Sequence, residues 1–330
     1  MRVGIELDQA IEELRRADKL LLTTHENPDG DALGSLLGMH WVLKQLGKDS
    51  VMYMSPDEFP LPIEYRYMTF DGIAEGPPSD IDDRVVVFLD CGNIDRMPVD
   101  FLQREGTHIL NIDHHHDNTR FGTVDLVVPD AACTTQIVFG LALELGAEIT
   151  PAIADALYVG LVTDTGRFTY ENTTAAAHRM AADLIEAGVN PHVVHRRLFE
   201  DLPVSRLKLL ARALDSVARY DGGAITMASL TRQDFESTGS LETDTEGVVD
   251  HMRSVEDTKV AVLARDLLSD DRRGWRKVSL RATDGSVDVS VIARSLGGGG
   301  HRQAAGASTQ LPLDELVAAI RAQVAAQLGA

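Results

Sequence analysis

Short apolar runs alternate with longer amphipathic stretches through the first 190 residues. The apolar runs have the length and bulk of buried strands, and they lie at 20–24, 51–54, 84–89, 108–112 and 123–128. Apolar residues at helical spacing predict helices at 5–17, 32–46, 134–145, 151–162 and 174–187. Strands that alternate with helices in this way indicate a parallel sheet packed against helices. We therefore predict an α/β fold for this part of the chain.

Polar side chains with metal-binding chemistry follow several of these predicted strands. They are His25, Asp29, Asp31, Asp90 and His114, and Asp164 similarly ends an apolar helix. Because the carboxyl ends of parallel strands meet at one edge of a sheet, we expect these side chains to converge there. Imidazole and carboxylate groups are suitable ligands for a divalent metal. An ordinary turn, with Asp31 capping the following helix, explains the first of these clusters equally well when it is taken alone.

The run Asp113-His114-His115-His116 ends the strand predicted at 108–112. Three successive histidines at a strand end are rarely needed for packing. Adjacent side chains point in different directions, so one histidine can bind a metal while the next faces a substrate. Asp113 is placed to orient a neighbouring histidine, and His116 is interpreted as a solvated neighbour. Thr134 or Thr135 is placed to cap the helix predicted at 134–145.

The composition changes after residue 190. A long charged helix, interrupted near Pro203, is predicted at 192–220 and suits an interdomain connector. Four segments after it are predicted as strands, with the sequences AITMASL, TKVAVLAR, RKVSLRA and SVDVSVIAR. Helices are predicted at 241–254 and 312–328. We predict a parallel-sheet, metal-binding domain at 1–190, a helical linker at 191–220 and a smaller α+β domain at 221–330. An active-site cleft is expected between the two domains.

The charge of the chain limits its partners. Lys and Arg total 31 and Asp and Glu total 51, for a net charge of -20, which disfavours long nucleic acids. An anionic substrate should therefore be short. The two cysteines form no CxxC motif, so neither a zinc site nor a disulfide framework is indicated. No apolar run approaches the ~20 residues of a membrane span, and we expect a cytoplasmic protein without membrane contact.

Taken in order, these motifs resemble those of the DHH phosphoesterase superfamily. The matching N-terminal residues are His25-x-x-x-Asp29-x-Asp31, Asp90, Asp113-His114-His115 and Asp164. Gly297 to His301, followed by Ala304-Ala305-Gly306, resembles the signature of the DHH-associated C-terminal domain. Within the superfamily the chain is similar to the bifunctional oligoribonuclease and PAP phosphatase group. Members of that group degrade RNAs of two to a few nucleotides and remove the 3′-phosphate of adenosine 3′,5′-bisphosphate (pAp), and some act on cyclic di-adenylate or linear pApA.

The resemblance implies two manganese ions, for which magnesium or cobalt are possible substitutes. His25, Asp29 and Asp90 would hold one ion, and Asp31, Asp90, His114 and Asp164 the other, with Asp90 bridging. Two divalent ions can activate a water and stabilise both oxygens of an in-line displacement at phosphorus. His115 is then expected to contact the scissile phosphate and assist the leaving group, with Asp113 behind it.

The second domain is expected to bind the rest of the substrate. Gly298, Gly299 and Gly300 lack side chains, so their backbone N–H groups can approach a phosphate beside His301, although a flexible loop is the alternative. Arg281 and Arg265 lie on apolar strands and are candidates for a phosphate clamp, or else ordinary surface residues. Phe168 can stack on a base or belong to the core. The roles of His116 and Arg302 are not assigned.

Several functions remain open from the sequence. The first hypothesis is a manganese-dependent phosphodiesterase and phosphatase for very short RNA, pAp and related dinucleotides. The alternatives are an inorganic pyrophosphatase or polyphosphatase, a RecJ-like single-strand exonuclease and a nucleotide-sensing binding protein. The sequence does not rank the candidate nucleotides. The resemblance also suggests a homodimer, for which no interface is specified.

Overall fold

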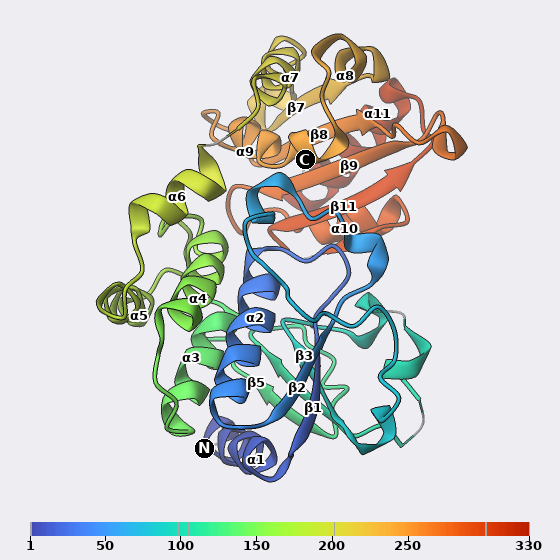
Figure 1. Cartoon of the computed structure of the whole chain (residues 1–330). Coiled ribbons are helices and arrows are strands. Elements are labelled where there is room, and N and C mark those ends of the chain that lie inside the picture. The colour runs from blue at the N-terminus through green and yellow to red at the C-terminus, as the bar shows by residue number, and fades with distance from the viewer. Residues whose placement is uncertain (1, 98, 105, 201, 301, 330) are drawn as a thin grey trace. The chain divides into compact units, whose positions relative to one another are not determined.

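The computed structural model describes residues 2–97, 99–104, 106–200, 202–300 and 302–329. The chain divides into two compact units, Met1–Asp201 and Leu202–Ala330, and each has its own sheet (Figure 1). The domain and linker bounds given above, and the cleft between the domains, stay predictions. No helix among the described residues is both long and apolar enough to cross a membrane.

The first unit contains the parallel sheet predicted from the sequence. Its strands are β1 (Lys19–Thr23), β2 (Asp49–Tyr53), β3 (Val85–Leu89), β4 (Ile109–Asp113) and β5 (Val124–Val127). They are all parallel, in the order β2-β1-β3-β4-β5. This strand order reverses direction between β1 and β3, which is where open α/β sheets bind their ligands. The α/β prediction is therefore confirmed.

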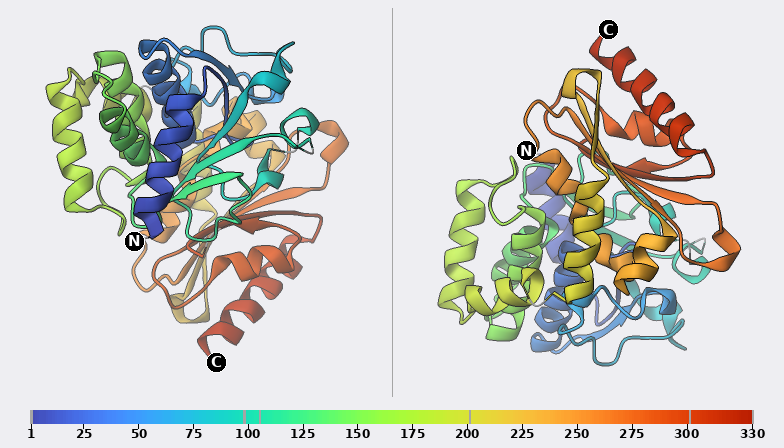
Figure 2. Two further views of the ribbon diagram at one scale, coloured as in Figure 1. Left: turned by 90° about the horizontal axis from the view of Figure 1, so that it is seen from below. Right: turned by 90° about the horizontal axis from the view of Figure 1, so that it is seen from above.

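The two faces of this sheet are covered differently. On one face α1 (Arg2–Arg16), α2 (Gly30–Gln45) and α3 (Thr134–Glu144) contact the strands. Outside them, α4 (Pro151–Asp164) packs on α2 and α3, and α5 (Ala175–Glu186) packs on α4 (Figures 1 and 2). The helix α6 (Pro191–Phe199) follows α5 and adds Val194 and Leu198 to the same core. The opposite face packs against loops, including Met97 and Leu102 from the segment between β3 and β4, in a cluster centred on Phe88. Strand residues are consequently buried on both sides, which explains their continuous apolar runs.

Helices α2 and α4 approach each other closely through glycine. A Cβ atom built on Gly34 would lie 2.5 Å from the carbonyl oxygen of Ala156, so no larger residue fits there without movement. A Cβ atom on Gly160 would likewise lie 2.7 Å from a carboxylate oxygen of Asp31. This close packing places the first turn of α2 beside the last turns of α4, and therefore Asp31 in the neighbourhood of Asp164.

The second unit contains a six-stranded sheet in the order β10-β11-β9-β8-β7-β6, in which only β7 and β8 are parallel. Its strands are β6 (Ala218–Tyr220), β7 (Ile225–Leu230), β8 (Val260–Asp266), β9 (Arg276–Ala282), β10 (Gly299–Gly300) and β11 (Ala304–Thr309). One face packs against α10 (Val289–Ser295) and α11 (Leu313–Leu328), and the other against α7 (Val204–Asp215), α8 (Arg232–Thr238) and α9 (Val248–Arg253). The smaller α+β architecture is confirmed.

Two secondary-structure predictions need correction in this region. The helix predicted at 192–220 is interrupted near Pro203 as predicted, since Pro203 is the N-cap residue of α7, but its last residues form the strand β6 and not helix. The run SVDVSVIAR is not a strand: Asp288 accepts a hydrogen bond from the Ser290 N–H and starts α10. Apolar residues at helical spacing, including Val289 and Ile292, are then buried on one face of α10.

A buried arginine joins the amino ends of β1, β2 and β3, since Arg84 directly precedes β3 and donates to the Leu20 carbonyl of β1 at 3.3 Å. Arg84 donates to the Asp49 carbonyl at 3.0 Å, to the Asp49 carboxylate at 2.8 Å and to the Asp80 carboxylate at 2.8 Å. We expect Arg84→Met to lower the free energy of unfolding by about 1–3 kcal/mol, because the carbonyl groups lose their buried donor, whereas the partly exposed Asp49 and Asp80 carboxylates can turn to water. Urea unfolding at neutral pH measures this loss. Arg104→Met, which breaks the exposed pair with Asp82, is the matched control and should cost less than about 1 kcal/mol.

A buried histidine in α2 should make the free energy of unfolding depend on pH. Burial, with a smaller effect of Lys44, lowers the pKa of His40 from 6.5 to about 4, and its Nδ1 lies 3.0 Å from the Ser50 hydroxyl. Below pH ~6.5 the unfolded chain binds a proton that the folded protein excludes, so stability should fall as the pH is lowered. Between pH 7.5 and 5.5 we expect the wild type to lose about 1 kcal/mol more than His40→Gln in urea unfolding. Equal losses in both proteins would refute this prediction.

Candidate metal centre

The loop after β1 holds a buried histidine in a defined tautomer. His25 is almost fully buried, and its Nδ1 lies 2.8 Å from the carbonyl oxygen of Glu26. Because a carbonyl can only accept, Nδ1 carries the proton and Nε2 presents its lone pair. Nε2 lies 3.7 Å from a carboxylate oxygen of Asp90. The backbone therefore fixes His25 in the form that binds a metal.

The sequence predicts that Asp31 caps the helix after β1, but the structure gives this role to Asp29. Asp29, not Asp31, caps α2, with Oδ1 accepting from the N–H groups of Asp31 and Ala32 at 3.0 and 3.1 Å. Asp31 instead reaches the first turn of α3, where the N–H groups of Thr134 and Thr135 donate to its two oxygens at 2.6 and 2.9 Å. The threonine side chains do not cap α3, whose N-cap residue is Cys133 without a side-chain bond. The first N–H groups of α3, which have no partner within the helix, are thus satisfied by a carboxylate from another helix.

Asp90 lies at the centre of the cluster. It follows β3 with a left-handed backbone angle (φ 58°), and its N–H donates to the Ile112 carbonyl of β4 at 3.0 Å. This conformation turns the carboxylate across the sheet edge, where Oδ1 accepts from the Thr134 hydroxyl at 2.9 Å. The Nε2 atom of His114 lies 3.7 Å from the same oxygen. An aspartate in this strained conformation indicates a position fixed for function.

Asp164 comes to the cluster from the last residue of α4, not from a strand. Its Oδ2 lies 3.7 Å from His114 Nε2 and accepts a hydrogen bond from the Asn172 amide at 3.2 Å. Three groups of potential metal ligands result, each with its ligand atoms within 4.8 Å of one another. They are His25–Asp29–Asp90, Asp31–His114–Asp164 and Asp90–His114–His115. The structure therefore brings together all six residues predicted as metal ligands.

Electrostatics favour a cation in this cluster. Burial, together with the negative charges of Asp90, Asp164 and Asp29, raises the pKa of Asp31 well above its ordinary value. Burial foremost also raises the pKa of Asp164 to about 7. Burial acts to raise the pKa of Asp90 too, but the neighbouring imidazoles, His25 foremost, hold it below its ordinary value. Several carboxylates and two imidazoles crowded at low exposure form a donor set that a divalent ion would neutralise, and we conclude that these residues fit a metal.

Behind the metal-binding groups, Asp113 orients His115. Its Oδ1 lies 2.6 Å from His115 Nδ1, and its Oδ2 accepts from the Asn118 amide at 2.5 Å. Because the carboxylate accepts, Nδ1 carries a proton. Burial acts to lower the pKa of His115, but the hydrogen bond to Asp113 and the charge of Asp90 raise it to about 9. A histidine held in this way is suited to contact or protonate an anionic group.

Comparisons with known proteins identify the family of the chain. Residues 19–161 match the model of the DHH family N-terminal domain, and residues 238–326 match the DHHA1 domain. The bifunctional oligoribonuclease and PAP phosphatase NrnA of Thermus thermophilus is 37% identical over 321 residues, which cover 96% of this chain and 90% of that protein. The chain belongs to the NrnA family of DHH phosphoesterases.

Other relatives extend over similar lengths. The bifunctional oligoribonuclease and PAP phosphatase NrnA of Bacillus subtilis is 24% identical over 294 residues, covering 88% of this chain and 89% of that protein. The crystal structure of an exopolyphosphatase-related protein from Bacteroides fragilis shares the fold, with a TM-score of 0.86 at 23% identity over 99% of this chain and 97% of that chain. The resemblance found in the sequence motifs is confirmed. The prediction that the protein is a phosphoesterase of the DHH family is confirmed as well.

Several residues beside the NrnA-family motifs escaped the sequence analysis. Thr134, Asn118 and Asn172 hold the aspartates in place through hydrogen bonds, but isolated polar residues carry no recognisable signal. Arg96 is half-buried in a 3-10 turn, and its carbonyl accepts from the Glu26 N–H at 2.8 Å, next to His25. Burial and the charge of Arg96 act to lower the pKa of His25 and His115, although nearby carboxylates raise both overall. Arg96 is therefore a cation close to the cluster.

The structure gives two of the predicted substrate-binding residues other contacts. Arg265 is buried on β8 and forms an ion pair with Glu242, which explains an arginine on an apolar strand. Phe168 packs on the core of the first unit and stacks on His178, with ring centroids 5.0 Å apart. Roles in phosphate clamping and base stacking stay predictions. Arg281, half-buried on β9, donates to the Leu280 carbonyl at 3.1 Å.

The glycine run is partly explained by the sheet. Gly299 and Gly300 form β10, which pairs with β11. A Cβ atom on Gly298 would lie 2.1 Å from the Gly306 carbonyl oxygen, so this position needs glycine for strand packing. At Gly299 a Cβ atom would meet nothing within 4 Å. A phosphate-binding role of these glycines stays a prediction, and His301 lies outside the described residues. Arg302 donates to the Gly285 carbonyl at 2.7 Å.

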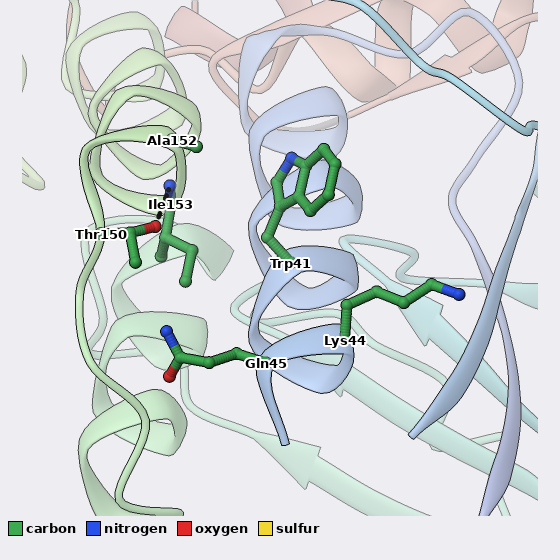
Figure 3. Close-up of a pocket in the computed structure, with 6 residues that line it drawn as sticks. All are labelled: Trp41, Lys44, Gln45, Thr150, Ala152 and Ile153. Atoms are coloured by element: carbon green, nitrogen blue, oxygen red, sulfur yellow. Dashed lines mark hydrogen bonds between the residues drawn. The ribbon is translucent and has the colours of Figure 1, made fainter. Parts of the chain in front are cut away.

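A surface pocket lies at the other end of the α2–α4 pair. It has a volume of about 360 Å³ and is lined by Trp41, Lys44, Gln45, Thr150, Ala152 and Ile153 (Figure 3). These residues come from the last turns of α2 and the start of α4, whereas Asp31 and Asp164 occupy the opposite ends of the same helices. The pocket is therefore separate from the metal-binding cluster.

Proposed function

We propose that this protein is a two-metal phosphodiesterase and phosphatase that hydrolyses very short oligoribonucleotides and pAp. The observation that carries the proposal is the convergence of His25, Asp29, Asp31, Asp90, His114 and Asp164 at the switch point of the sheet. The printed names of the NrnA relatives support the substrate class. Cyclic di-adenylate and linear pApA are included as candidate substrates, because they present the same phosphodiester chemistry.

We infer that the physiological metal is manganese, with magnesium or cobalt as possible substitutes. Mixed imidazole and carboxylate ligands suit manganese better than magnesium, which prefers oxygen ligands and water. His25, Asp29 and Asp90 would hold one ion, and Asp31, Asp90, His114 and Asp164 the other. Bound divalent ions lower the pKa of water and neutralise charge on a phosphoryl group. The chain's own part is to fix these ligands, through α3 for Asp31 and through Glu26 for His25.

The remaining residues of the first unit act on the phosphate and the leaving group. His115, with Nδ1 held by Asp113, is placed to present Nε2 to a phosphate oxygen or to the leaving oxygen. In this proposal Gly298, Gly299, Gly300, His301 and Arg281 bind the substrate from the second unit. The partners are short nucleotides, and the working form is a homodimer.

A neighbouring arginine should contribute to substrate binding. We expect Arg96→Ala to raise KM for pAp by about 10-fold or more while changing kcat less, because a charge-assisted hydrogen bond to phosphate contributes about 1.5–3 kcal/mol. Steady-state kinetics with saturating manganese measure the effect, and Arg96→Lys should recover part of it. Arg104→Ala, an exposed arginine paired with Asp82, is the control and should behave as wild type. An unchanged KM in Arg96→Ala would remove this role.

A turnover panel tests the proposed function. Purified protein is stripped with a chelator, reloaded with manganese and offered a 5′-phosphorylated diribonucleotide, pAp, linear and cyclic di-adenylate and pyrophosphate, with Asp90→Ala as the blank. Hydrolysis of the nucleotides but not of pyrophosphate is expected, and the relative kcat/KM values rank the substrates. Cleavage of pyrophosphate alone would instead establish a pyrophosphatase. Tight nucleotide retention without phosphate release would establish a binding protein.

A further inference from the structure

Helix α7 is apolar on two opposite sides. Its inner side contributes the fully buried Leu209 and Ala213 to the core shared with α8 and α9. Its outer side carries Val204, Leu207 and Leu214, which are 66%, 56% and 47% exposed, with Ala211 also exposed between them. A surface helix normally has one apolar face and one polar face, so the outer side of α7 is suited to a contact beyond its own core.

The outer residues follow the spacing of a helix-pairing seam. Positions 204, 207, 211 and 214 are separated by three, four and three residues, which places them in one stripe along the helix. Leu241 is 60% exposed and follows Ser240, whose hydroxyl donates to the Ser205 carbonyl at the start of α7. A further large apolar side chain therefore lies next to the amino-terminal end of the same helix.

The charges beside the stripe match a second copy of the same helix. Lys208 and Asp215 lie seven residues apart, so they share one flank of the stripe. In an antiparallel pair related by a twofold axis near Ala211, Leu207 of each copy meets Leu214 of the other. In the same register, Lys208 of each copy lies beside Asp215 of the other, so that both charges are paired twice. The small side chain of Ala211 lets the two helices approach at the centre.

We propose that the outer stripe of α7 is the contact surface of a homodimer in which two α7 helices pair antiparallel. This inference rests on the homodimer of the proposed function and is independent of the proposed hydrolysis. A helix of 12 residues is about 18 Å long and covers less than the ~1,600 Å² of a standard stable interface. We therefore expect a reversible dimer whose population depends on protein concentration.

Sedimentation velocity over about a hundredfold range of protein concentration tests the surface. The wild type should shift from monomer to dimer, and Leu207→Glu should stay monomeric throughout. Leu143→Glu, an exposed leucine of α3, is the matched control and should dimerise as the wild type does. A wild type that is monomeric at every concentration overturns the dimer. A Leu207→Glu variant that still dimerises overturns the assigned surface.

Charge exchange tests the antiparallel register. Lys208→Asp and Asp215→Lys should each weaken the dimer at least about tenfold, and the double variant should restore it. The two single variants, mixed in equal amounts, should form a heterodimer, because each supplies the charges that the other lacks. Failure of both the double variant and the mixture to restore association overturns the register. Turnover of pAp is measured on every sample, so that a failed dimer is distinguished from a failed hydrolase.

Discussion

Replacement of Asp90 by asparagine is expected to lower kcat for pAp hydrolysis by roughly 10³-fold or more. Asp90 lies between His25 and His114 and takes part in two of the three groups of potential metal ligands. An amide has nearly the shape of the carboxylate but no negative charge, so the variant should keep the fold and lose the central ligand. The loss corresponds to about 4 kcal/mol of transition-state stabilisation, a magnitude that electrostatic stabilisation by metal ions can supply.

Metal binding separates this explanation from a misfolded protein. The bound manganese, measured by elemental analysis after gel filtration, should fall from two ions per chain to one or none. The thermal stabilisation that manganese gives to the wild type should shrink in the same variant. Asp130→Asn, which changes an exposed aspartate in the loop after β5, is the matched control and should retain both ions and full turnover. Full metal content together with full turnover in Asp90→Asn would refute the bridging role.

The substitution His115→Ala should remove catalysis while leaving the metal site intact. His115 is held by Asp113 at 2.6 Å, and its expected role is to contact the scissile phosphate and assist the leaving group. Loss of a positioned acid–base group lowers kcat by roughly 10²–10⁴-fold. We therefore expect kcat for pAp to fall within this range while two manganese ions remain bound.

The geometry also offers an outcome that would contradict this role. His115 also belongs to one of the three groups of potential metal ligands, with Asp90 and His114. If His115→Ala lost manganese in proportion to its activity, His115 would be a metal ligand rather than a group that acts on the substrate. His116→Ala changes the exposed neighbouring histidine and should retain both activity and metal. The pair of variants thus separates the two histidines by measurement.

The sequence alone predicted the elements whose signals are local. A continuous apolar run such as 85–89 forms a strand because both faces of the sheet are covered, and β3 occupies that range. Polar residues directly after such runs converge because parallel strands share one carboxyl edge, which is how Asp90 and His114 come together. Even the error at α10 has a local cause: apolar residues in short runs suit a strand or a helix, and the cap formed by Asp288 selects the helix.

The tertiary structure decided which partner each polar group found. Asp31 reads as a helix cap in the sequence, yet its carboxylate binds the start of α3, whose Thr134 lies 103 residues away. Gly34 and Gly160 set the approach of α2 to α4, and nothing in their local sequence indicates that closeness. Arg265 has the side-chain chemistry of a phosphate-binding residue, but it forms an ion pair with Glu242. The pattern of apolar and polar residues determined where the strands lie and which side chains follow them. Long-range packing fixed the orientation of each metal-binding side chain, because hydrogen-bond partners that are close in space can be far apart along the chain.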